Sequence, residues 1–423
     1  MPAVPHGLGD GDRMNSQNGT MEHIDGAQGG AAPESKLRIG ILGGTLDPVH
    51  NGHLEIAVAA MTELRLDHVL LLPAGDPPHK KRRTDKWARM RMTELAAGTH
   101  AGLIASDAEI RRMGTTYTVD TLTALSVERP EVEWTYIVGA DTLHKLDSWK
   151  EFPRVARLCV FAAVERPGCD RALTELRAKA IAECYHTRVE ILSVSGPKIS
   201  STQVRRCVAE GKDIGGLVPA GVAAYIRDHG LYLCDYNENQ ILEMLKAHLT
   251  ERRFIHTLGV ADTAQRLAPR CGVDPMRARL AGLLHDCAKS MPLEEMRALV
   301  TARMPDLDQA ELDTRAILHA PAGMIVAEDA FGVRDPQILS AIRKHTVGDG
   351  EMSAMDALIY VSDFIEPGRE PFPGLDRARK AAEKDIWQAM RICAELTAKH
   401  LKSRGQDIHP RTLKLLERYG GRA

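Results

Sequence analysis

The feature that most constrains the fold of this chain is a change of pattern near residue 234. Before it, short aliphatic segments alternate with amphipathic stretches of helical spacing, which is the pattern of a parallel sheet wound with helices on both faces. The predicted strands are Leu37–Leu42, His68–Leu72, Trp134–Val138, Leu158–Val164 and Val189–Leu192. From Gln240 onward only helical spacing is found, as in Ala278, Ala281, Gly282 and Leu284. We therefore predict an α/β doubly wound parallel-sheet domain followed by an all-α domain.

The domain boundary is placed between Leu233 and Glu238. A chain of 423 residues is longer than one ordinary core requires, so we expect one domain over residues 36–234 and a second over 238–423. Residues 1–35 are rich in Gly, Asn, Asp and Gln and poor in aliphatic residues. They cannot bury enough apolar surface to offset the entropy of ordering, and we expect a disordered tail.

Composition excludes several classes of partner. The net charge is −2 and aromatic residues make up 4% of the chain, so neither nucleic acid nor an anionic membrane is an expected partner. No apolar run approaches the roughly 18 residues needed to span a bilayer, and the N-terminus has no apolar core of a signal peptide. The eight cysteines never occur as C-x-x-C. We interpret them as reduced thiols of a cytoplasmic protein.

The first candidate site follows the first predicted strand. Gly43, Gly44 and Thr45 precede His50 and His53, which lead into a predicted helix over Leu54–Leu64. Glycines let backbone amides approach a phosphate chain, and the positive end of a helix attracts it further. The two histidines, three residues apart, can donate to the oxygens of a phosphate undergoing in-line displacement. A glycine-rich turn with surface histidines is the alternative interpretation of this segment alone.

A second phosphate-binding segment far downstream weakens that alternative. Ile199 to Arg205 reads I-S-S-T-Q-V-R and places hydroxyls at a helix N-terminus with an arginine close behind. The two segments resemble the H-x-G-H and I-S-S-T-x-x-R signatures of the Rossmann-like nucleotidylyltransferases. The resemblance narrows to nicotinate-nucleotide adenylyltransferase over roughly residues 36–234. It is carried by Pro73–Lys80, Thr116–Thr121, Gly139–Asp141, Leu146–Trp149 and Glu165–Gly168.

The resemblance implies a role for each matched residue. His50, His53 and Arg205 would be catalytic, with the two histidines stabilising the transition state at the ATP α-phosphate. Gly43, Gly44, Thr45, Asp141, Ser201 and Thr202 would bind ATP, while Thr116, Tyr117 and Trp149 would surround the ring of nicotinate mononucleotide. Mg²⁺ is expected to accompany ATP, held by phosphates. Trp149 alone could equally be a core aromatic residue, and Lys80 fits a solvated basic run slightly better than a phosphate ligand.

The second candidate site lies in the helical half. His285 and Asp286 fall inside a predicted amphipathic helix, Leu280–Lys289, where a charge is costly unless a metal pairs with it. Together with four further candidates they form a mixed N/O set suited to two divalent transition metals. The full set is His256, His285, Asp286, His319, His345 and Asp363. Taken singly, each histidine could be a helix-surface residue.

The order of these residues resembles the HD-domain phosphohydrolases. It matches in particular the YqeK-like branch, which hydrolyses diadenosine tetraphosphate symmetrically. The resemblance implies a dinuclear centre of iron or manganese, with Lys289 and Arg253 as phosphate-binding candidates and a dinucleoside polyphosphate as substrate. For Lys289, a surface cation at a helix end is nearly as good an interpretation. The alternatives for this half are a different nucleotide phosphohydrolase or a regulatory nucleotide-binding module.

Overall fold

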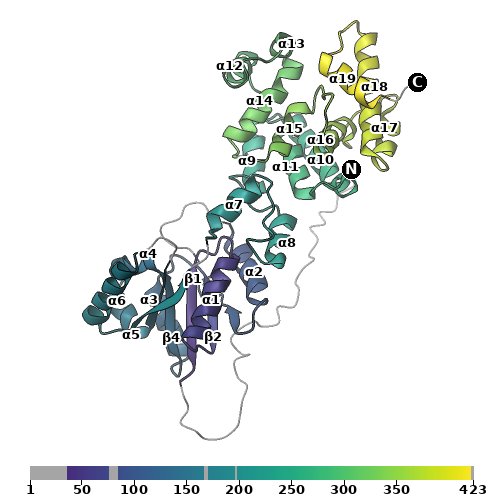
Figure 1. Ribbon diagram of the computed structural model, residues 1–423. Coiled ribbons are helices and arrows are strands. Elements are labelled where there is room, and N and C mark those ends of the chain that lie inside the picture. The colour runs from purple at the N-terminus through teal and green to yellow at the C-terminus, as the bar shows by residue number, and fades with distance from the viewer. Residues whose placement is uncertain (1–35, 76–83, 166–169, 196–197, 421–423) are drawn as a thin grey trace, which may run out of the picture. The chain divides into compact units, whose positions relative to one another are not determined.

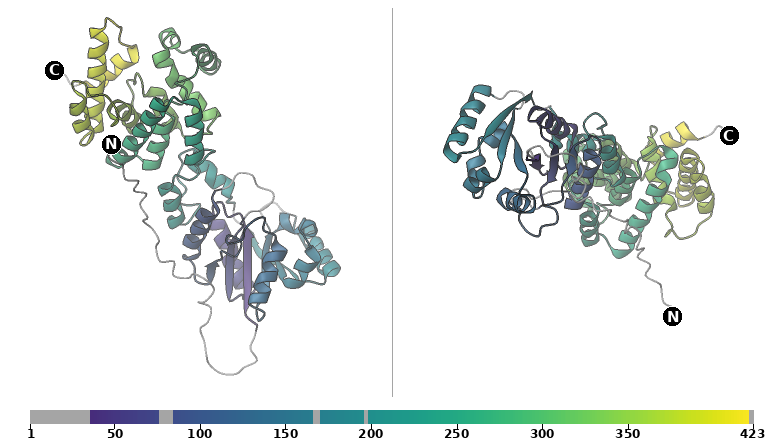
Figure 2. Two further views of the ribbon diagram at one scale, coloured as in Figure 1. Left: turned by 180° about the vertical axis from the view of Figure 1, so that it is seen from behind. Right: turned by 90° about the horizontal axis from the view of Figure 1, so that it is seen from below.

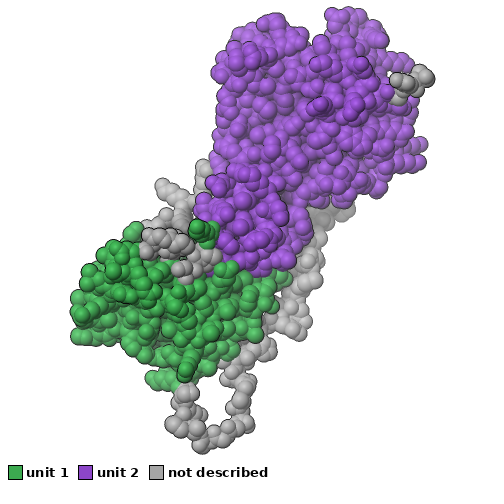
Figure 3. All heavy atoms as spheres, in the orientation of Figure 1, with its two compact units in different colours: residues 1–46, 53–198 green, residues 47–52, 199–423 purple. Residues whose placement is uncertain are grey.

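A computed structural model describes residues 36–75, 84–165, 170–195 and 198–420. The expected disordered tail over 1–35 lies outside the described residues, as do residues 76–80 and 166–168 of the matched segments. Contacts divide the chain into two compact units, coloured separately in Figure 3. The first comprises the described residues up to Leu46 together with His53–Lys198, and the second comprises Asp47–Gly52 together with Ile199 onward.

The first unit contains one six-stranded parallel sheet with strand order β3-β2-β1-β4-β5-β6 (Figure 1). Its strands are β1 (Arg38–Gly44), β2 (His68–Pro73), β3 (Leu103–Ala105), β4 (Glu133–Gly139), β5 (Val160–Glu165) and β6 (Val189–Ser195). Ile41 of β1 is in register with Leu70 of β2 and with Tyr136 of β4. The strand order reverses its direction at β1, and ligands of open α/β sheets bind beyond the carboxyl ends of the strands at such a point.

Helices cover both faces of this sheet, as the view from below in Figure 2 shows. Right-handed crossovers that run in opposite directions from the middle of a sheet require this arrangement. The helices are α1 (Asn51–Glu63), α2 (Lys86–Ala97), α3 (Thr118–Glu128), α4 (Ala140–Leu143), η2 (Leu146–Ser148), α5 (Phe152–Leu158) and α6 (Arg171–Tyr185). The predicted α/β doubly wound fold is confirmed. The three-residue strand β3 was not predicted, because it is too short to show a pattern.

The second unit is helical among its described residues. Its helices are α7 (Ser201–Ala209), α8 (Ala220–Asp228), α9 (Glu238–His248), α10 (Glu251–Leu267), η3 (Ala268–Cys271), α11 (Pro275–Leu284), α12 (Leu293–Arg303), α13 (Gln309–Asp313), α14 (Arg315–Asp329), α15 (Pro336–Lys344), α16 (Ala354–Ile365), α17 (Leu375–Ala382), α18 (Ile386–Ser403) and α19 (Pro410–Tyr419). Its main core is built on α10, α11, α15, α16 and α18. None of the helices in the described ranges is long and apolar enough to cross a membrane.

Candidate functional sites

The glycine-rich segment begins at the carboxyl end of β1. Gly43 packs against the hydroxyl of Tyr136, which leaves no room for a side chain at this position. Beyond it, the backbone oxygen of Gly44 accepts a hydrogen bond of 2.7 Å from Ala74 at the end of β2. His50 is buried and directly precedes α1, while half-buried His53 lies in its first turn. Both predicted histidines therefore stand at the positive end of a helix.

The structure brings the downstream phosphate-binding segment onto the first one. Ser200 is the N-cap of α7, and its hydroxyl accepts a hydrogen bond from the amide of Gln203. Ser201 Oγ donates to the backbone oxygen of Pro48 at 2.9 Å, and Arg205 Nη1 donates to that of Asp47 at 2.5 Å. Segments more than 150 residues apart in sequence are thus joined by direct hydrogen bonds.

Two further contacts complete this cluster. Arg205 Nη2 donates to Thr202 Oγ1 at 3.1 Å, so two predicted phosphate ligands also touch each other. Tyr232 Oη donates to the Asp47 carboxylate at 2.6 Å. Tyr232 was not predicted, because a lone tyrosine in a connecting segment matches no motif.

The predicted nicotinate residues lie in the first unit. Thr116 is buried, and its hydroxyl oxygen has no hydrogen-bond partner among the described residues. Half-buried Trp149 packs edge-on against Tyr136, with ring centroids 5.6 Å apart. The ammonium of Lys150 lies 4.3 Å from the ring centroid of Tyr117, so the Trp149–Lys150 segment borders Tyr117. Lys150 was not predicted, although its place directly after Trp149 is a signal that could have found it.

Asp141 lies on a different element from these residues. It is exposed, in the short helix α4 that follows β4 directly. This position is again beyond the carboxyl end of a central strand.

The second site is assembled where several helices end or cross. His256 lies on α10, His319 on α14 and Asp363 on α16, whereas His285 and His345 are the residues at which α11 and α15 end. The predicted helix over Leu280–Lys289 is confirmed as far as Leu284 and wrong from His285 onward, where turns follow α11. The apolar spacing continues past Leu284, but the chain leaves the helix there so that His285 and Asp286 can both turn inward.

The six predicted ligands converge in the protein interior. His285, Asp286, His319 and His345 are each at most 3% exposed. Nε2 of His319 lies 3.0 Å from Asp286 Oδ1, and Nε2 of His345 lies 3.5 Å from the same atom. Donor atoms of His256, His285 and Asp363 form one group within 4.8 Å of one another, and those of His285, Asp286 and His345 form a second. His285 belongs to both groups, but its one free ring nitrogen carries a single lone pair, so it can bind only one cation at a time.

The protonation states of these histidines fit metal binding. His285 Nδ1 lies 2.7 Å from the backbone oxygen of Gly282, and His345 Nδ1 lies 2.7 Å from that of Ile342. Because a carbonyl only accepts, both rings carry their proton on Nδ1 and present the lone pair of Nε2. His285 Nε2 is buried with no hydrogen-bond partner in the described residues. A divalent cation bound to this nitrogen would supply the partner that a buried polar atom needs.

The electrostatics point in the same direction. Burial is the largest single influence on His285 and lowers its pKa, but the charge and hydrogen bond of Asp286, the charge of Asp363 and the hydrogen bond to Gly282 together outweigh it and raise that pKa. Burial raises the pKa of Asp286, yet His285, His319 and His345 together hold it well below its usual range. The pKa of His319 falls to about 4, chiefly through burial. The cluster thus keeps its carboxylates ionised and attracts a positive charge, whether a proton or a metal ion.

Cationic side chains border the ligand cluster. Arg253 Nη1 lies 2.7 Å from Asp286 Oδ2. Lys289 Nζ lies 2.9 Å from His319 Nε2, and burial lowers the pKa of this lysine. Arg369 Nη2 lies 2.9 Å from Asp363 Oδ1. Arg253 and Lys289 were predicted near the metals, whereas Arg369 was not, although it ends the segment that carries Asp363.

Glu366 is a further residue that sequence reasoning did not assign. Its Oε1 lies 3.1 Å from His256 Nδ1, and its Oε2 accepts a hydrogen bond from the amide of Gly368. The carboxylate is buried, with the residue 3% exposed. The other ring nitrogen of His256 faces Asp363 Oδ1 at 3.0 Å without hydrogen-bond geometry. Glu366 therefore fixes the His256 proton on Nδ1 and leaves Nε2 free to bind a cation.

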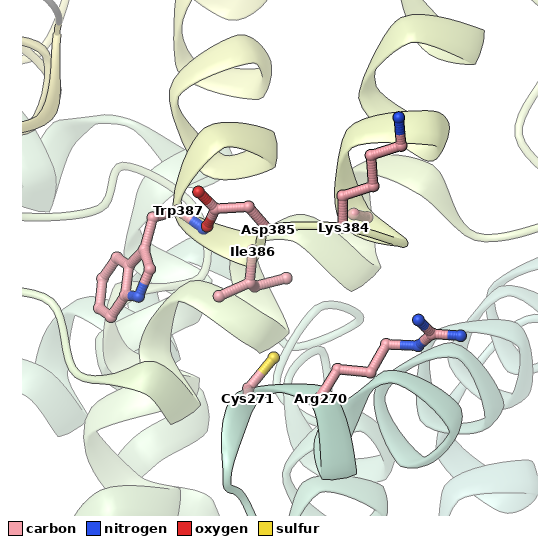
Figure 4. Close-up of a pocket in the computed structure, with 7 residues that line it drawn as sticks. Arg270, Cys271, Lys384, Asp385, Ile386 and Trp387 are labelled. Atoms are coloured by element: carbon pink, nitrogen blue, oxygen red, sulfur yellow. The ribbon is translucent and has the colours of Figure 1, made fainter.

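A separate cavity of about 220 Å³ in the helical unit contains none of these residues (Figure 4). It is lined by Arg270, Cys271, Ala382, Lys384, Asp385, Ile386 and Trp387. Arg270 pairs with the carboxylate and the backbone oxygen of Glu383. Figure 4 shows the Lys384 and Arg270 side chains pointing apart, so they do not converge on a ligand.

Fold and sites define a chain that joins a nucleotidyltransferase domain to a helical metal-binding domain. A family model described as Cytidylyltransferase-like matches residues 41–207, and one for the HD domain matches residues 253–406. A probable nicotinate-nucleotide adenylyltransferase from Synechococcus sp. (strain JA-3-3Ab) is 42% identical over 46% of this chain and 95% of its own. The chain belongs to the nicotinate-nucleotide adenylyltransferase family and carries an HD domain, which binds divalent metal.

A further relative matches most of the chain, and a solved structure matches less than half of it. A probable nicotinate-nucleotide adenylyltransferase/Ap4A hydrolase from Mycoplasma genitalium is 27% identical over 84% of this chain and 97% of its own. A solved structure from Clostridium acetobutylicum, described as a predicted HD superfamily hydrolase involved in NAD metabolism, is 38% identical over 44% of this chain and 97% of its own, with a TM-score of 0.42. Both resemblances stated from the sequence motifs are confirmed.

Proposed function

We propose that this chain is a bifunctional enzyme. One half transfers the adenylyl group of ATP to nicotinate mononucleotide, giving deamido-NAD and pyrophosphate in NAD biosynthesis. The other half hydrolyses diadenosine tetraphosphate symmetrically to two ADP. The observation that carries this proposal is that one chain holds both the joined phosphate-binding segments and the buried His/Asp cluster. A Mycoplasma relative that is similar over 84% of this chain bears both names.

Adenylyl transfer needs positioning and charge neutralisation rather than a covalent enzyme intermediate. The phosphate of the mononucleotide attacks the α-phosphorus of ATP in line, and pyrophosphate leaves. His50 and His53 at the start of α1 would donate hydrogen bonds to the α-phosphate oxygens as charge develops there. The predicted partners of the ATP phosphates are Ser201, Thr202 and Arg205, together with the backbone at Gly43–Thr45.

The hydrogen bonds of Ser201 and Arg205 have a consequence for ATP binding. Their partners are neutral backbone oxygens of Pro48 and Asp47. A phosphate is a stronger acceptor for a guanidinium than a neutral carbonyl, so ATP can take over these donors. Asp141 is proposed to bind the adenosine ribose.

Selection of the acid mononucleotide is assigned to Thr116 and the residues beside it. Its buried hydroxyl, unpartnered in the described structure, can donate to the nicotinate carboxylate. The nearby indole of Trp149 and ring of Tyr117 offer aromatic faces and edges for the electron-poor pyridine ring.

The hydrolytic site is assigned to two divalent metal ions, which supply an activated hydroxide and Lewis-acid polarisation of a phosphoryl oxygen. His256 and Asp363 would help to hold one, and Asp286 and His345, with His319 beside them, would help to hold the other, while His285 would bind one of the two. Arg253, Lys289 and Arg369 would bind the polyphosphate. Complete retention of the six ligands favours catalysis over a purely regulatory nucleotide-binding role.

The N/O donor set favours iron or manganese in this site, and Mg²⁺ is proposed to enter the first site with ATP. A cytoplasmic location fits the cysteines, and the seven in the described residues are all free. The domain limits are proposed as 36–234 and 238–423. Neither nucleic acid nor a membrane is proposed as a partner.

The proposal is tested on the purified full chain, loaded with manganese or iron. With ATP and nicotinate mononucleotide it should release pyrophosphate and form deamido-NAD. With diadenosine tetraphosphate it should give ADP as the sole nucleotide product, and a chelator should stop this second reaction. Products of AMP plus ATP, or an uncleaved dinucleotide, would contradict the hydrolase assignment, and absence of pyrophosphate would contradict the transferase assignment.

A further inference from the structure

Arg89 of α2 is one of the largest fully buried side chains of the described structure, at 1% exposure. A buried guanidinium must have all its donors satisfied, because an unpaired charge in the interior is very costly. Backbone oxygens satisfy it here. Nη1 donates to Thr45 at 2.9 Å and to Ala74 at 2.6 Å, Nη2 donates to Gly75 at 3.0 Å, and Nε donates to Thr84 at 3.1 Å.

These backbone oxygens lie where two neighbouring strands end. Thr45 follows β1 directly, and Ala74 and Gly75 follow β2 directly. The planar fork of one arginine thus holds together two loops at the carboxyl edge of the sheet, beyond the last β1–β2 pair, Gly44 with Pro73. No other side chain has enough donors in a fixed plane to do this.

Both loops are connected to proposed substrate contacts. Thr45 belongs to the segment assigned to the ATP phosphates. Gly75 approaches so closely to the backbone of Glu109 and the methyl group of Thr116 that a side chain would clash there. The position of Gly75 therefore bears directly on Thr116, one of the residues assigned to the mononucleotide.

Arg89 also controls which polar groups these loops can present. In a trans peptide unit the C=O and N–H point to opposite sides. Directing the Thr45 and Ala74 oxygens toward the guanidinium turns the N–H groups of Leu46 and Gly75 away from it. The same hydrogen bonds keep negative carbonyl dipoles from facing an anionic ligand, where they would repel it.

We propose that Arg89 is a positioning residue for adenylyl transfer, which sets the ends of β1 and β2 for both substrates. This inference rests on the proposed transferase function. Since one group holds both loops, its loss should raise the KM of ATP and of nicotinate mononucleotide together. Misplacement of reacting groups by about 1 Å can cost about 100-fold, so kcat/KM should fall by about that factor in Arg89→Met.

Arg89→Lys is the conservative variant. Lysine keeps the charge but, as a compact point donor, cannot reach oxygens on both loops in one plane. We expect a fall in kcat/KM of about 10-fold or more, with both KM values raised. The matched control is Arg91→Lys on the same helix, whose exposed side chain pairs only with the neighbouring Glu94 in the contacts described. It should change neither KM.

The experiment compares full-length wild type, R89K, R89M and R91K. Each is measured by pyrophosphate release at varied ATP and varied mononucleotide, by diadenosine tetraphosphate hydrolysis, and by thermal melting. The inference is supported if R89K melts like wild type and hydrolyses normally while both KM values rise. It is overturned if R89K has wild-type KM values, if only one KM rises, or if R89K and R89M lose the first unit's melting transition, which would make Arg89 merely structural. An inactive wild type would instead refute the proposed transferase function.

Discussion

Replacing Glu366 by glutamine should weaken metal binding in the HD domain, although the residue is not itself a predicted ligand. Both carboxylate oxygens of Glu366 act as hydrogen-bond acceptors: Oε1 faces His256 Nδ1, and Oε2 accepts from the amide of Gly368. Glutamine offers one oxygen and one NH₂ group. If the oxygen stays on Gly368, the NH₂ group faces His256 and moves the ring proton to Nε2, the nitrogen proposed to bind metal.

The expected magnitude follows from burial and position. Loss of a partner that orients a ligating histidine lowers metal affinity by about 10–100-fold, which corresponds to about 1.4–2.8 kcal/mol. Gly259 and Gly368 lie so close to the carboxylate that a side chain at either position would meet Oε2 of Glu366. We expect the loss of metal affinity in Glu366→Gln to lie within this range, and the loss in Glu366→Ala to reach its upper end.

The assay is metal content after dialysis against buffered metal concentrations, with tetraphosphate hydrolysis measured alongside. Glu370→Gln is the control, because Glu370 lies in the same segment but is exposed and contacts Arg252 across 3.3 Å at the surface. Adenylyl transfer is measured on the same variants, and an unchanged rate shows that the transferase half is intact. If Glu366→Gln binds metal as tightly as Glu370→Gln, the role given to the Glu366 carboxylate is refuted.

Three further outcomes are expected. His53→Ala should lower kcat of adenylyl transfer by about 100–1000-fold, as for loss of a preorganised donor, and a near-normal kcat would remove His53 from the mechanism. Trp149→Ala should raise the KM of the mononucleotide more than that of ATP, and equal effects measured in the same assay would make Trp149 structural. Asp286→Ala should abolish metal content and tetraphosphate hydrolysis but leave pyrophosphate release unchanged, since the sheet and the helical half have separate cores and sites without shared partners act independently. Parallel loss of both activities would show that the mutation unfolds the chain.

Much of the fold follows from periodicity. The strands from β1 to β6 were predicted within one or two residues at their starts, with the exception of β3, because continuous aliphatic runs mark buried parallel strands. β3 is short and lies at the edge of the sheet, where few residues are buried. The end of α11 was missed for a different reason. Apolar residues continue to repeat in the turn after Leu284, and a spacing rule does not distinguish a buried turn from a buried helix.

Some residues of the candidate sites could be predicted from the sequence and others could not. Residues that act through a side chain in a short motif, such as His285 or Ser201, could be found because the motif itself carries the chemistry. Arg89 and Glu366 could not, since their partners are backbone oxygens and a ring nitrogen supplied by distant segments. Their roles depend on geometry that exists only after folding. Roles assigned to the site residues remain predictions until the variants are measured.

The hydrogen bond from Tyr232 to Asp47 has a consequence for synthesis on the ribosome. Its two residues are 185 positions apart, and chains are made at about 5–20 residues per second. Tyr232 is therefore translated on the order of 10–40 s after Asp47. During that interval the strands and helices between these two residues can already form and pack. The loop that contains Asp47 is therefore expected to be among the last parts of the nascent transferase to reach its final conformation.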